Sequence, residues 1–251
     1  MNIIQTFYNN LAFHYHKLFL DWESSTKGQA AILNKIFRDN GFDDTSGILD
    51  CACGIGTQAI GLAELGYKVT ASDFSQGALA EARERAEKRD VNIRFEQADF
   101  CALSETFSEQ FDIVIAMDNA LPHMLTEGDL ENAIRSITER ISSGGIFVAS
   151  IRDYDALLVD KPAYSSPYIH KTDKGQRVSF QTWEWNGECY KLIQYIIDDE
   201  DSTQVARFEC KYRATRREEI TNMLLSNGCS QVKWLFPEKT DFYQPIVVGR
   251  K

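Results

Sequence analysis

Three aspartates stand at the ends of successive short apolar runs in the sequence. Asp50 closes the first run, Asp73 follows the second and Asp99 follows the third. A single aspartate at such a place is often only a turn residue or a helix cap. A carboxylate there also attracts cations and disfavours phosphate groups, which prefer helix N-termini and positive charge. Three carboxylates in succession therefore indicate a site for a cationic ligand.

A glycine-rich turn follows Asp50 directly, in the stretch LDCACGIGTQAIGLA (49–63). Its segment GIGTQA fits the pattern G-x-G-x-x-G/A, so a dinucleotide is one candidate ligand. The carboxylate immediately before the glycines opposes a pyrophosphate, because like charges repel. S-adenosylmethionine fits the carboxylates better, since it carries an ammonium, a sulfonium and a ribose diol but no phosphate. We therefore expect it rather than a dinucleotide.

The two cysteines of this turn do not indicate a metal site. Cys51 and Cys53 have one residue between them, and no second Cys/His cluster stands at the spacing of a zinc site. The six cysteines of the chain are scattered through apolar segments, as buried reduced thiols usually are. We expect neither a metal nor a disulfide framework.

The charge balance makes several partners unfavourable. The chain has 27 basic and 37 acidic residues and a formal net charge of −10, which opposes binding to nucleic acid or to an anionic membrane. No apolar stretch approaches the roughly 20 residues of a membrane-spanning helix, and the N-terminus lacks the blocks of a signal peptide. We expect a cytoplasmic protein with no nucleic-acid or membrane partner. A homo-oligomeric assembly is compatible with the sequence.

β-rich runs alternate with helical stretches in the central part of the chain. The expected strands cover 47–51, 67–72, 92–97, 111–117 and 145–150, and the expected helices cover 57–65, 75–89 and 127–142. Ser75 is a candidate N-cap, and Gly144 with Gly145 is expected to stop the third helix. Strands separated by helices predict βαβ units in a doubly wound, mainly parallel α/β sheet, with ligands at the carboxyl ends of the strands.

The flanking segments have other patterns. The N-terminal part has apolar residues at three-to-four-residue spacing, which predicts a helix with one apolar face. Beyond residue 151 come three β-like runs, of which the first two meet at the hairpin signal Asn186-Gly187. A helix and two strands then follow. We predict a helical cap (1–43), a cofactor-binding core (44–150), an inserted antiparallel lid (151–215) and a segment that completes the core sheet (216–251).

The core from about residue 44 to 150 resembles the class I S-adenosylmethionine-dependent methyltransferases. The turn LDCACGIGTQAIGLA and the segments VTASDFS, QADF and SSGGIFVAS look like successive motifs of that family. The resemblance implies a seven-stranded Rossmann-like sheet, S-adenosylmethionine as cofactor and S-adenosylhomocysteine as its product. It also implies that Gly54 and Gly56 line the amino-acid end, that Asp73 binds the ribose, and that Asp99 and Phe100 hold the adenine.

The full set of expected cofactor-binding residues is Tyr15, Trp22, Lys27, Asp50, Ala52, Gly54, Gly56, Asp73, Phe74, Ala98, Asp99, Phe100 and Met117. Tyr15 and Trp22 would come from an N-terminal segment that folds over the cofactor. One departure from the family concerns the cofactor's carboxylate, which an arginine after the N-terminal helix often meets. The nearest candidate in this chain is Lys27.

Further segments resemble the glycine/sarcosine N-methyltransferase branch of the family over nearly the whole chain. MDNALPHML (117–125) and SIRDYDAL (150–157) carry most of this likeness. It implies that Arg152 grips a substrate carboxylate, that Asn119 orients the acceptor amine and that His123 supports the same wall. The planar fork of an arginine suits a carboxylate, and an ion pair of Arg152 with a neighbouring acid such as Asp153 or Asp155 is the alternative.

The expected reaction needs little acid–base chemistry. Displacement of a sulfonium methyl by a neutral amine depends on alignment, which corresponds to roughly 7–11 kcal/mol in well-oriented systems. His123 is a candidate base, with a role as a turn or helix-start residue as the alternative. Tyr243 either faces the methyl group or packs in the core. The expected catalytic residues are Asn119 and His123, and the expected substrate-binding residues are Asn119, His123, Arg152, Tyr154 and Tyr243.

The sequence thus predicts methyl transfer to the nitrogen of a small carboxylate-bearing amine such as glycine or sarcosine. One alternative is a tailoring N- or O-methyltransferase with a larger acceptor, because lid loops such as 160–175 set the pocket size. Another is a nucleotide-binding sensor or an NAD-dependent enzyme. The lid aromatics could surround an alkylated ammonium, although ordinary sheet packing is the preferred interpretation. They are Trp183, Trp185, Tyr190 and Tyr195.

Overall fold

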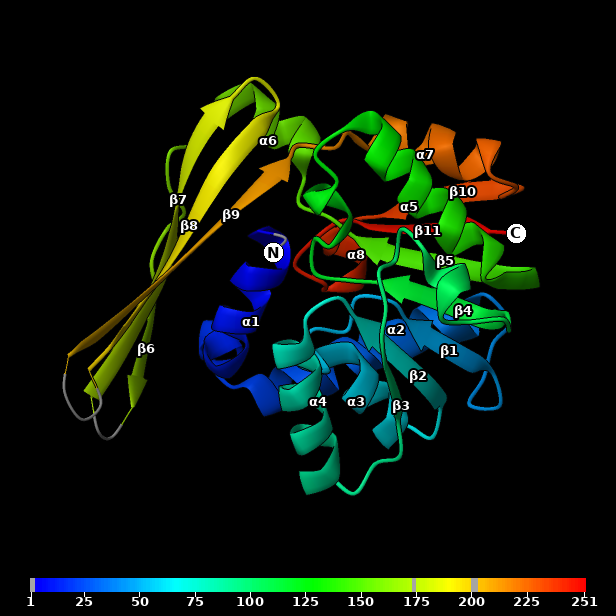
Figure 1. Ribbon diagram of the computed structural model, residues 1–251, viewed down its shortest axis with the longest axis horizontal. Helices are drawn as coiled ribbons and strands as arrows, with labels where there is room; N and C mark the ends of the chain where they lie inside the picture. Colours follow the sequence, from blue (N-terminus) through cyan, green and yellow to red (C-terminus); the bar gives the residue numbers. More distant parts are fainter. Residues whose placement is uncertain (1–2, 173–174, 200–202) are drawn as a thin grey trace.

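The computed structural model describes residues 3–172, 175–199 and 203–251, which form a larger and a smaller β-sheet (Figure 1). The larger sheet has seven strands. Their order is β10 (Gln231–Leu235), β11 (Ile246–Arg250), β5 (Ile141–Ser150), β4 (Phe111–Ala116), β1 (Gly47–Asp50), β2 (Lys68–Asp73) and β3 (Arg94–Gln97). Strands β1 to β5 pair in parallel, whereas β11 runs antiparallel to both of its neighbours.

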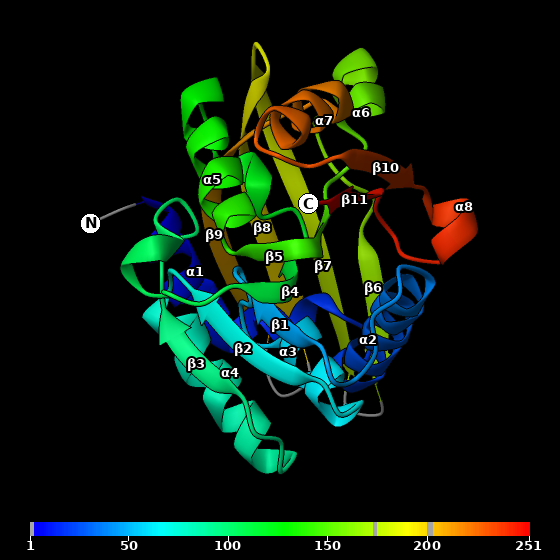
Figure 2. The same cartoon turned by 90° about the vertical axis from the view of Figure 1, so that its right-hand side faces the viewer.

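Helices cover both faces of this sheet (Figure 2). The helices α2 (Trp22–Asp39), α3 (Thr57–Glu64) and α4 (Gln76–Lys88) pack on one face, and α5 (Glu127–Glu139) and α7 (Arg217–Ser226) pack on the other. Central strands that are buried on both faces need near-continuous apolar sequence, as in FDIVIA of β4. The predicted doubly wound, mainly parallel, seven-stranded α/β fold is confirmed.

The turn between β1 and α3 requires its glycines. Gly54 and Gly56 have φ values of +53° and +88°, in the left-handed region that most side chains avoid. A Cβ atom on Gly56 would also lie 2.8 Å from Cδ1 of Ile60. The tight turn brings the N-terminus of α3 to the carboxyl edge of the sheet, where the first candidate residues lie.

One predicted element boundary is wrong. Helix α5 ends at Glu139, and the next strand, β5, already begins at Ile141, which pairs with Phe111. The pairing of β4 with β5 then shifts register and resumes at Ile146 opposite Ile113. The glycines at 144 and 145 therefore lie where β5 shifts register against β4, and they do not end helix α5. Glycines within strands often mark such irregularities.

The smaller sheet, named the lid sheet after the predicted lid, lies beside the larger sheet (Figure 1). It contains the antiparallel strands β6 (Tyr168–Thr172), β7 (Gly175–Asn186), β8 (Cys189–Asp198) and β9 (Gln204–Arg213). The predicted hairpin joins β7 to β8, and its two central residues are Gly187 and Glu188, one position later than expected. Gly187 has the positive φ, +64°, that such a turn needs.

Helix α1 (Ile3–Tyr15) lies between the two sheets (Figure 1). It continues as the 3-10 turn η1 (His16–Leu18), and its buried Phe7 and Leu11 confirm the predicted apolar face. The short helices α6 (Tyr154–Asp160) and α8 (Pro237–Thr240) and strand β6 were not predicted. In the described part of the chain, no helix is both long and apolar enough to cross a membrane.

Candidate active site

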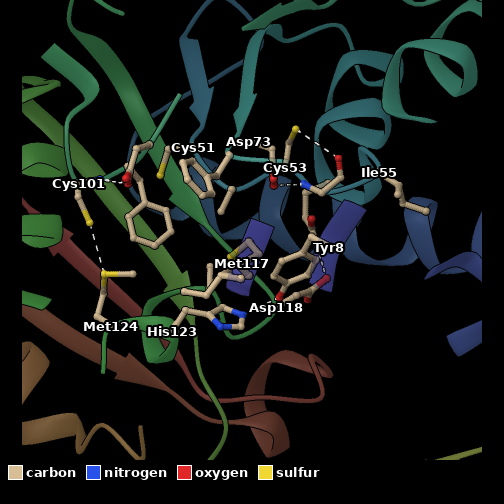
Figure 3. Close-up of a pocket in the computed structure, with 18 of the residues that line it drawn as sticks. Tyr8, Cys51, Cys53, Ile55, Asp73, Cys101, Met117, Asp118, His123 and Met124 are labelled. Carbon is tan, nitrogen blue, oxygen red and sulfur yellow. Dashed lines mark hydrogen bonds between the residues drawn. The ribbon is translucent and has the colours of Figure 1, made fainter. Parts of the chain in front are cut away.

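A cavity of about 430 Å³, the strand-end cavity, opens at the carboxyl ends of β1, β2 and β4 (Figure 3). Four carboxylates line it, and no described lining residue is a lysine or an arginine. The carboxylates belong to Asp73, Asp99, Asp118 and Asp129. This lining favours a ligand with positive charge and disfavours one with phosphates, because the walls offer no counter-charge to an anion.

Asp73 lies at the centre of this cavity wall. Its Oδ2 accepts a hydrogen bond from the Gly54 amide and its Oδ1 accepts one from the Ser75 amide, both at 2.8 Å. Burial raises the pKa of the Asp73 carboxyl, whereas the amide hydrogen bonds oppose that rise. These two bonds hold the carboxylate at the glycine turn, and each oxygen keeps lone pairs for a ligand hydroxyl.

Asp50 is fully buried behind the turn and does not itself line the cavity. Its Oδ1 accepts from the Ala52 amide at 3.3 Å, and no described atom hydrogen-bonds to its Oδ2. Burial raises the pKa of the Asp50 carboxyl well above its ordinary value. Such a group favours a nearby positive charge, since an unpaired buried carboxylate is costly.

Most of the expected cofactor-binding residues come together in the strand-end cavity. Those that line it are Tyr15, Ala52, Gly54, Asp73, Phe74, Asp99, Phe100 and Met117. Gly56 and Ala98 stand next to lining residues in the chain without lining the cavity themselves.

Two expected residues of the N-terminal segment lie elsewhere. The ring of Trp22 is buried, its Nε1 donates to Thr57 Oγ1 at 3.0 Å, and the guanidinium of Arg85 lies 4.7 Å from the ring centroid. Trp22 therefore packs behind a residue that lines the cavity. Lys27 is exposed on α2 and lines neither this cavity nor the second one.

A second cavity of about 660 Å³, the lid cavity, lies between α1, the edge of the larger sheet and the lid strands. It shares Tyr8, Tyr15 and Asp118 with the strand-end cavity, so the two spaces adjoin at these side chains. Of the expected substrate-binding residues, Asn119, Arg152 and Tyr243 line the lid cavity, whereas His123 lines the strand-end cavity and Tyr154 lines neither.

Arg152 is held in the lid cavity by neutral groups. Its guanidinium donates to Tyr190 Oη at 3.0 Å and to Gln181 Oε1 at 2.8 Å, and it lies 5.0 Å from the Trp183 ring centroid. Over residues 3–172, 175–199 and 203–251, no carboxylate forms an ion pair with it. Two of the four lid aromatics, Trp183 and Tyr190, thus contact the protein's own cation, whereas Trp185 donates to the Pro162 carbonyl and Tyr195 stacks on Phe180.

The neighbouring acids do not neutralise Arg152. Asp153 and Asp155 both pair instead with Arg217, and Asp153 also caps α6 through the Ala156 amide. The alternative that Arg152 forms an ion pair with Asp153 or Asp155 is therefore wrong. A guanidinium in this state suits an anionic ligand that can accept two parallel hydrogen bonds.

Two consecutive residues after β4 adopt the left-handed backbone conformation, Asp118 at φ +57° and Asn119 at φ +71°. For a residue with a Cβ this conformation costs roughly 1–2 kcal/mol, and Asp and Asn are among those that adopt it most readily. Asn119 Oδ1 accepts from the Arg152 amide at 3.1 Å and from Tyr154 Oη at 3.0 Å. Its Nδ2 is buried and has no partner among the described atoms, and Asn119 is one of the residues that line the lid cavity.

His123 is poorly suited to act as a base. Its Nε2 lies 2.7 Å from Tyr8 Oη, and its ring centroid lies 4.2 Å from that of Tyr212 (Figure 3 shows the Tyr8 contact). Burial lowers the pKa of His123 to about 3. A base works best with a pKa near the working pH, so this neutral ring instead fixes the position of the Tyr8 hydroxyl.

Sequence reasoning missed Tyr8 and Asp118. Asp118 lines both cavities, accepts from Gln58 Nε2 at 2.9 Å and from Tyr243 Oη at 2.7 Å, and burial raises the pKa of its carboxyl. The rule that selected Asp73, a carboxylate just after a strand, also applies to Asp118. Tyr8 gives no such signal, because its partner His123 lies 115 residues further along the chain.

The fold and the acidic strand-end cavity resemble those of class I S-adenosylmethionine-dependent methyltransferases. A family model described as a methyltransferase domain matches residues 48–145. A solved S-adenosylmethionine-dependent methyltransferase from Clostridium acetobutylicum has the same fold, with a TM-score of 0.74, 17% identity and 97% of both chains covered. An amino pentose methyltransferase from Micromonospora echinaspora gives 0.73 at 16% identity, covering 90% of this chain and 91% of that one. Residues 48–145 thus resemble a methyltransferase domain, and the whole fold is one that S-adenosylmethionine-dependent methyltransferases adopt.

Within the class, the chain is similar to glycine/sarcosine N-methyltransferases. That of Parasynechococcus marenigrum is 30% identical over 139 residues, 55% of this chain and 48% of the relative. That of Aphanothece halophytica is 27% identical over 193 residues, 77% of this chain and 64% of the relative. The chain thus spans between about half and two thirds of the length of these curated relatives.

Proposed function

We propose that the protein transfers a methyl group from S-adenosylmethionine to the amine nitrogen of a small molecule that carries a carboxylate. One observation carries this proposal. The acidic strand-end cavity adjoins the lid cavity, whose Arg152 guanidinium has no carboxylate partner in the described chain. The first space suits a cationic methyl donor and the second suits an anionic group on the acceptor.

The residues of the strand-end cavity fit S-adenosylmethionine group by group. Asp73 accepts from the ribose hydroxyls, and the backbone around Ala52 and Gly54 receives the amino-acid end, near the unpaired oxygen of Asp50. Phe74, Asp99 and Phe100 supply an apolar surface and a carboxylate for the adenine and its amine. The bound cofactor supplies a methyl group on a positively charged sulfur.

The lid cavity supplies the acceptor site. Arg152 donates to the acceptor's carboxylate, and the free Nδ2 of Asn119 provides a further donor at the same wall. The names of the relatives, glycine/sarcosine N-methyltransferases, support an amino acid of this kind. Binding at both ends aligns the acceptor nitrogen with the junction of the two cavities, and alignment is the larger part of this catalysis.

A larger acceptor is the second candidate, because of the size of the lid cavity. Its volume, about 660 Å³, falls within the roughly 300–1,000 Å³ typical of sites for drug-sized ligands. Glycine, whose side chain is one hydrogen atom, fills little of that space. The amino pentose methyltransferase among the structures of the same fold supports an amino sugar as the competing acceptor class.

Calorimetry and a methyl-transfer panel test these proposals. We expect S-adenosylhomocysteine to bind and NAD not to bind, and binding of NAD alone would contradict the assignment of the cofactor cavity. The panel pairs each carboxylate-bearing amine with its decarboxylated analogue, for example glycine with methylamine, and includes an amino sugar. Turnover of the carboxylate member only is expected. Turnover of the amino sugar alone would replace the first candidate with the second.

A further inference from the structure

Two half-buried groups of opposite charge line the lid cavity, and among the described residues each has only neutral hydrogen-bond partners. The Asp118 carboxylate accepts from an amide and a phenol, and the Arg152 guanidinium donates to a phenol and an amide. Within the described residues, neither group forms an ion pair with the other or with a third residue. Burying a charge without a counter-charge is costly, so this arrangement suits a ligand that brings both charges.

The position of Asp118 separates its role from that of Arg152. Asp118 lines both cavities, whereas Arg152 lines the lid cavity only. The Asp118 amide donates to Ser150 Oγ at 2.8 Å, which fixes the left-handed turn at the end of β4. The atom that receives the methyl group must approach this same junction, so the acceptor nitrogen is the ligand atom nearest to Asp118.

The neighbouring amide cannot take this role. The Oδ1 of Asn119 already accepts two hydrogen bonds, so its Nδ2 is the side-chain atom left without a partner among the described atoms. An NH₂ group donates and cannot accept an N–H from an ammonium. The assignment of the acceptor amine to Asn119, made from the sequence, is therefore better transferred to the carboxylate beside it.

We propose that Asp118 binds the acceptor ammonium and takes the proton that the nitrogen must lose before it attacks. This inference rests on the proposed function. One N–H proton of R–NH₃⁺ passes to an oxygen of Asp118, which leaves R–NH₂ and a neutral carboxyl. The nitrogen lone pair then forms the N–CH₃ bond while the S–CH₃ bond breaks and its electron pair stays on sulfur. The product is R–NH₂CH₃⁺, and Asp118 releases its proton to solvent when the product leaves.

The surroundings of Asp118 favour this proton transfer. Burial raises the pKa of the carboxyl, while its hydrogen bonds from Tyr243 and Gln58 oppose the rise. The titratable groups that face it are Tyr15 from α1, Asp50 from β1 and Tyr243 from the segment before β11, and none of them is a cation. The positive charge of Arg152 lowers the pKa of Tyr15 and of Tyr243, against the rise caused by burial. A carboxyl in this setting accepts a proton more readily than one in water.

The test is the pH profile of kcat/KM for the wild type and for Asp118→Asn with the best carboxylate-bearing amine. The variant keeps the side-chain size but uses only the free amine in solution, whose pKa is about 10. We expect its kcat/KM to be roughly 100-fold to 1,000-fold lower at pH 7 and to rise about tenfold per pH unit up to that pKa. For the wild type we expect kcat/KM to depend much less on pH, once the pH is above the range in which Asp118 titrates. The wild type and Asp118→Asn should bind S-adenosylhomocysteine with affinities within about threefold of each other.

Two further variants keep the test decisive. Asp155→Asn removes a carboxylate that pairs with Arg217 at the surface, so it is the charge control and should stay within about twofold of the wild type. Tyr243→Phe removes a donor that lowers the pKa of Asp118, so the acid limb of its profile should move to higher pH. This second measurement remains available if Asp118→Asn does not fold.

Every outcome is informative. Parallel pH profiles for the wild type and Asp118→Asn would overturn the role of Asp118 alone, as would equal losses in acceptor and cofactor binding. If the wild type methylates no amine at all, the proposed function fails and this inference fails with it. An unmoved acid limb in Tyr243→Phe would also count against proton transfer to Asp118.

Discussion

The two cavities of this protein differ in how they are built and in what they select. The strand-end cavity is formed mainly by the segments that follow β1 to β4, with α1 and the first turn of α5 adding side chains, and its charged lining is acidic. The lid cavity is formed by side chains from α1, the lid strands and the segments after β4 and β5, and it contains a cation and an anion that have no ion-pair partner in the part of the chain that the structure describes. The proposed cofactor site is therefore mostly local in the sequence, whereas the proposed acceptor site depends on long-range packing.

The largest expected effect that separates the two cavities comes from Arg152. Arg152→Met removes the cation and should lower kcat/KM for a carboxylate-bearing amine by roughly 100-fold to 1,000-fold, because truncating one partner of a buried charge pair costs about 3–4 kcal/mol. Arg152→Lys keeps the charge but loses the fork, and we expect a roughly 10-fold to 100-fold loss. S-adenosylhomocysteine affinity, measured by calorimetry, should change less than twofold in both. If acceptor use and S-adenosylhomocysteine affinity fell by equal factors, the assignment of the two ligands to separate cavities would be contradicted.

Asp73→Asn should give the converse result in the strand-end cavity. A hydrogen bond to a charged group contributes about 1.5–3 kcal/mol, so S-adenosylhomocysteine should bind roughly 10-fold to 100-fold more weakly. The KM of the acceptor at saturating cofactor should stay within twofold. Asp112→Asn is a suitable control, since Asp112 accepts from the Gly47 amide at 2.8 Å at the opposite edge of the sheet. That control should change the free energy of unfolding but not cofactor binding.

His123 gives a pH-dependent prediction. Its pKa is about 3 in the folded protein and about 6.5 when unfolded, so the unfolded state binds more protons between these values. The contribution of His123 to the free energy of unfolding therefore falls as the pH falls through that window, by about 2 kcal/mol at pH 5. In urea titrations at pH 8 and pH 5, the stability deficit of His123→Gln relative to the wild type should shrink by about this amount. A constant deficit would contradict the buried, neutral ring.

The smallest expected effect concerns Lys27, which the sequence assigned to the cofactor's carboxylate. Its exposed position on α2, outside both cavities, leads us to expect that Lys27→Ala weakens S-adenosylhomocysteine binding by less than about twofold. Calorimetry at low ionic strength is the measurement, since any long-range attraction would be largest there. A loss of S-adenosylhomocysteine affinity of tenfold or more would show that Lys27 on α2 contributes to cofactor binding.

Most of the fold could be predicted because its signals are local. Each apolar run or helical stretch can be recognised from its own residues, without knowledge of its partners in the fold. Ser75 caps α4 as predicted, and the glycines of the first turn adopt positive φ values. The boundary between α5 and β5 was misjudged for a physical reason. The glycines at 144 and 145 end a helix in one context and permit a strand irregularity in another, and only the pairing of β5 with β4 decides between them.

The candidate site could be predicted only in part, for the same reason. The aspartates after β1 and β2 and the glycine turn follow from their places along the chain. Tyr8 and the neutral partners of Arg152 do not, because Tyr8 meets His123 across 115 residues and Arg152 meets Tyr190 across 38. Asp118 was within reach of the strand-end rule and was overlooked beside Asn119. The low pKa of His123 follows from burial, which no local pattern reveals.

The lid sheet also has a consequence for engineering. Its four strands, β6 to β9, form one stretch of chain between β5 and α7, whereas the strand-end residues lie outside that stretch. A single graft between Asp160 and Arg216 would replace the lid wall of the lid cavity and leave the glycine turn and its aspartates in place. Such a graft would exchange the lid side chains around Arg152, such as Gln181 and Tyr190, while Arg152 itself and the proposed methyl-donor site stay constant.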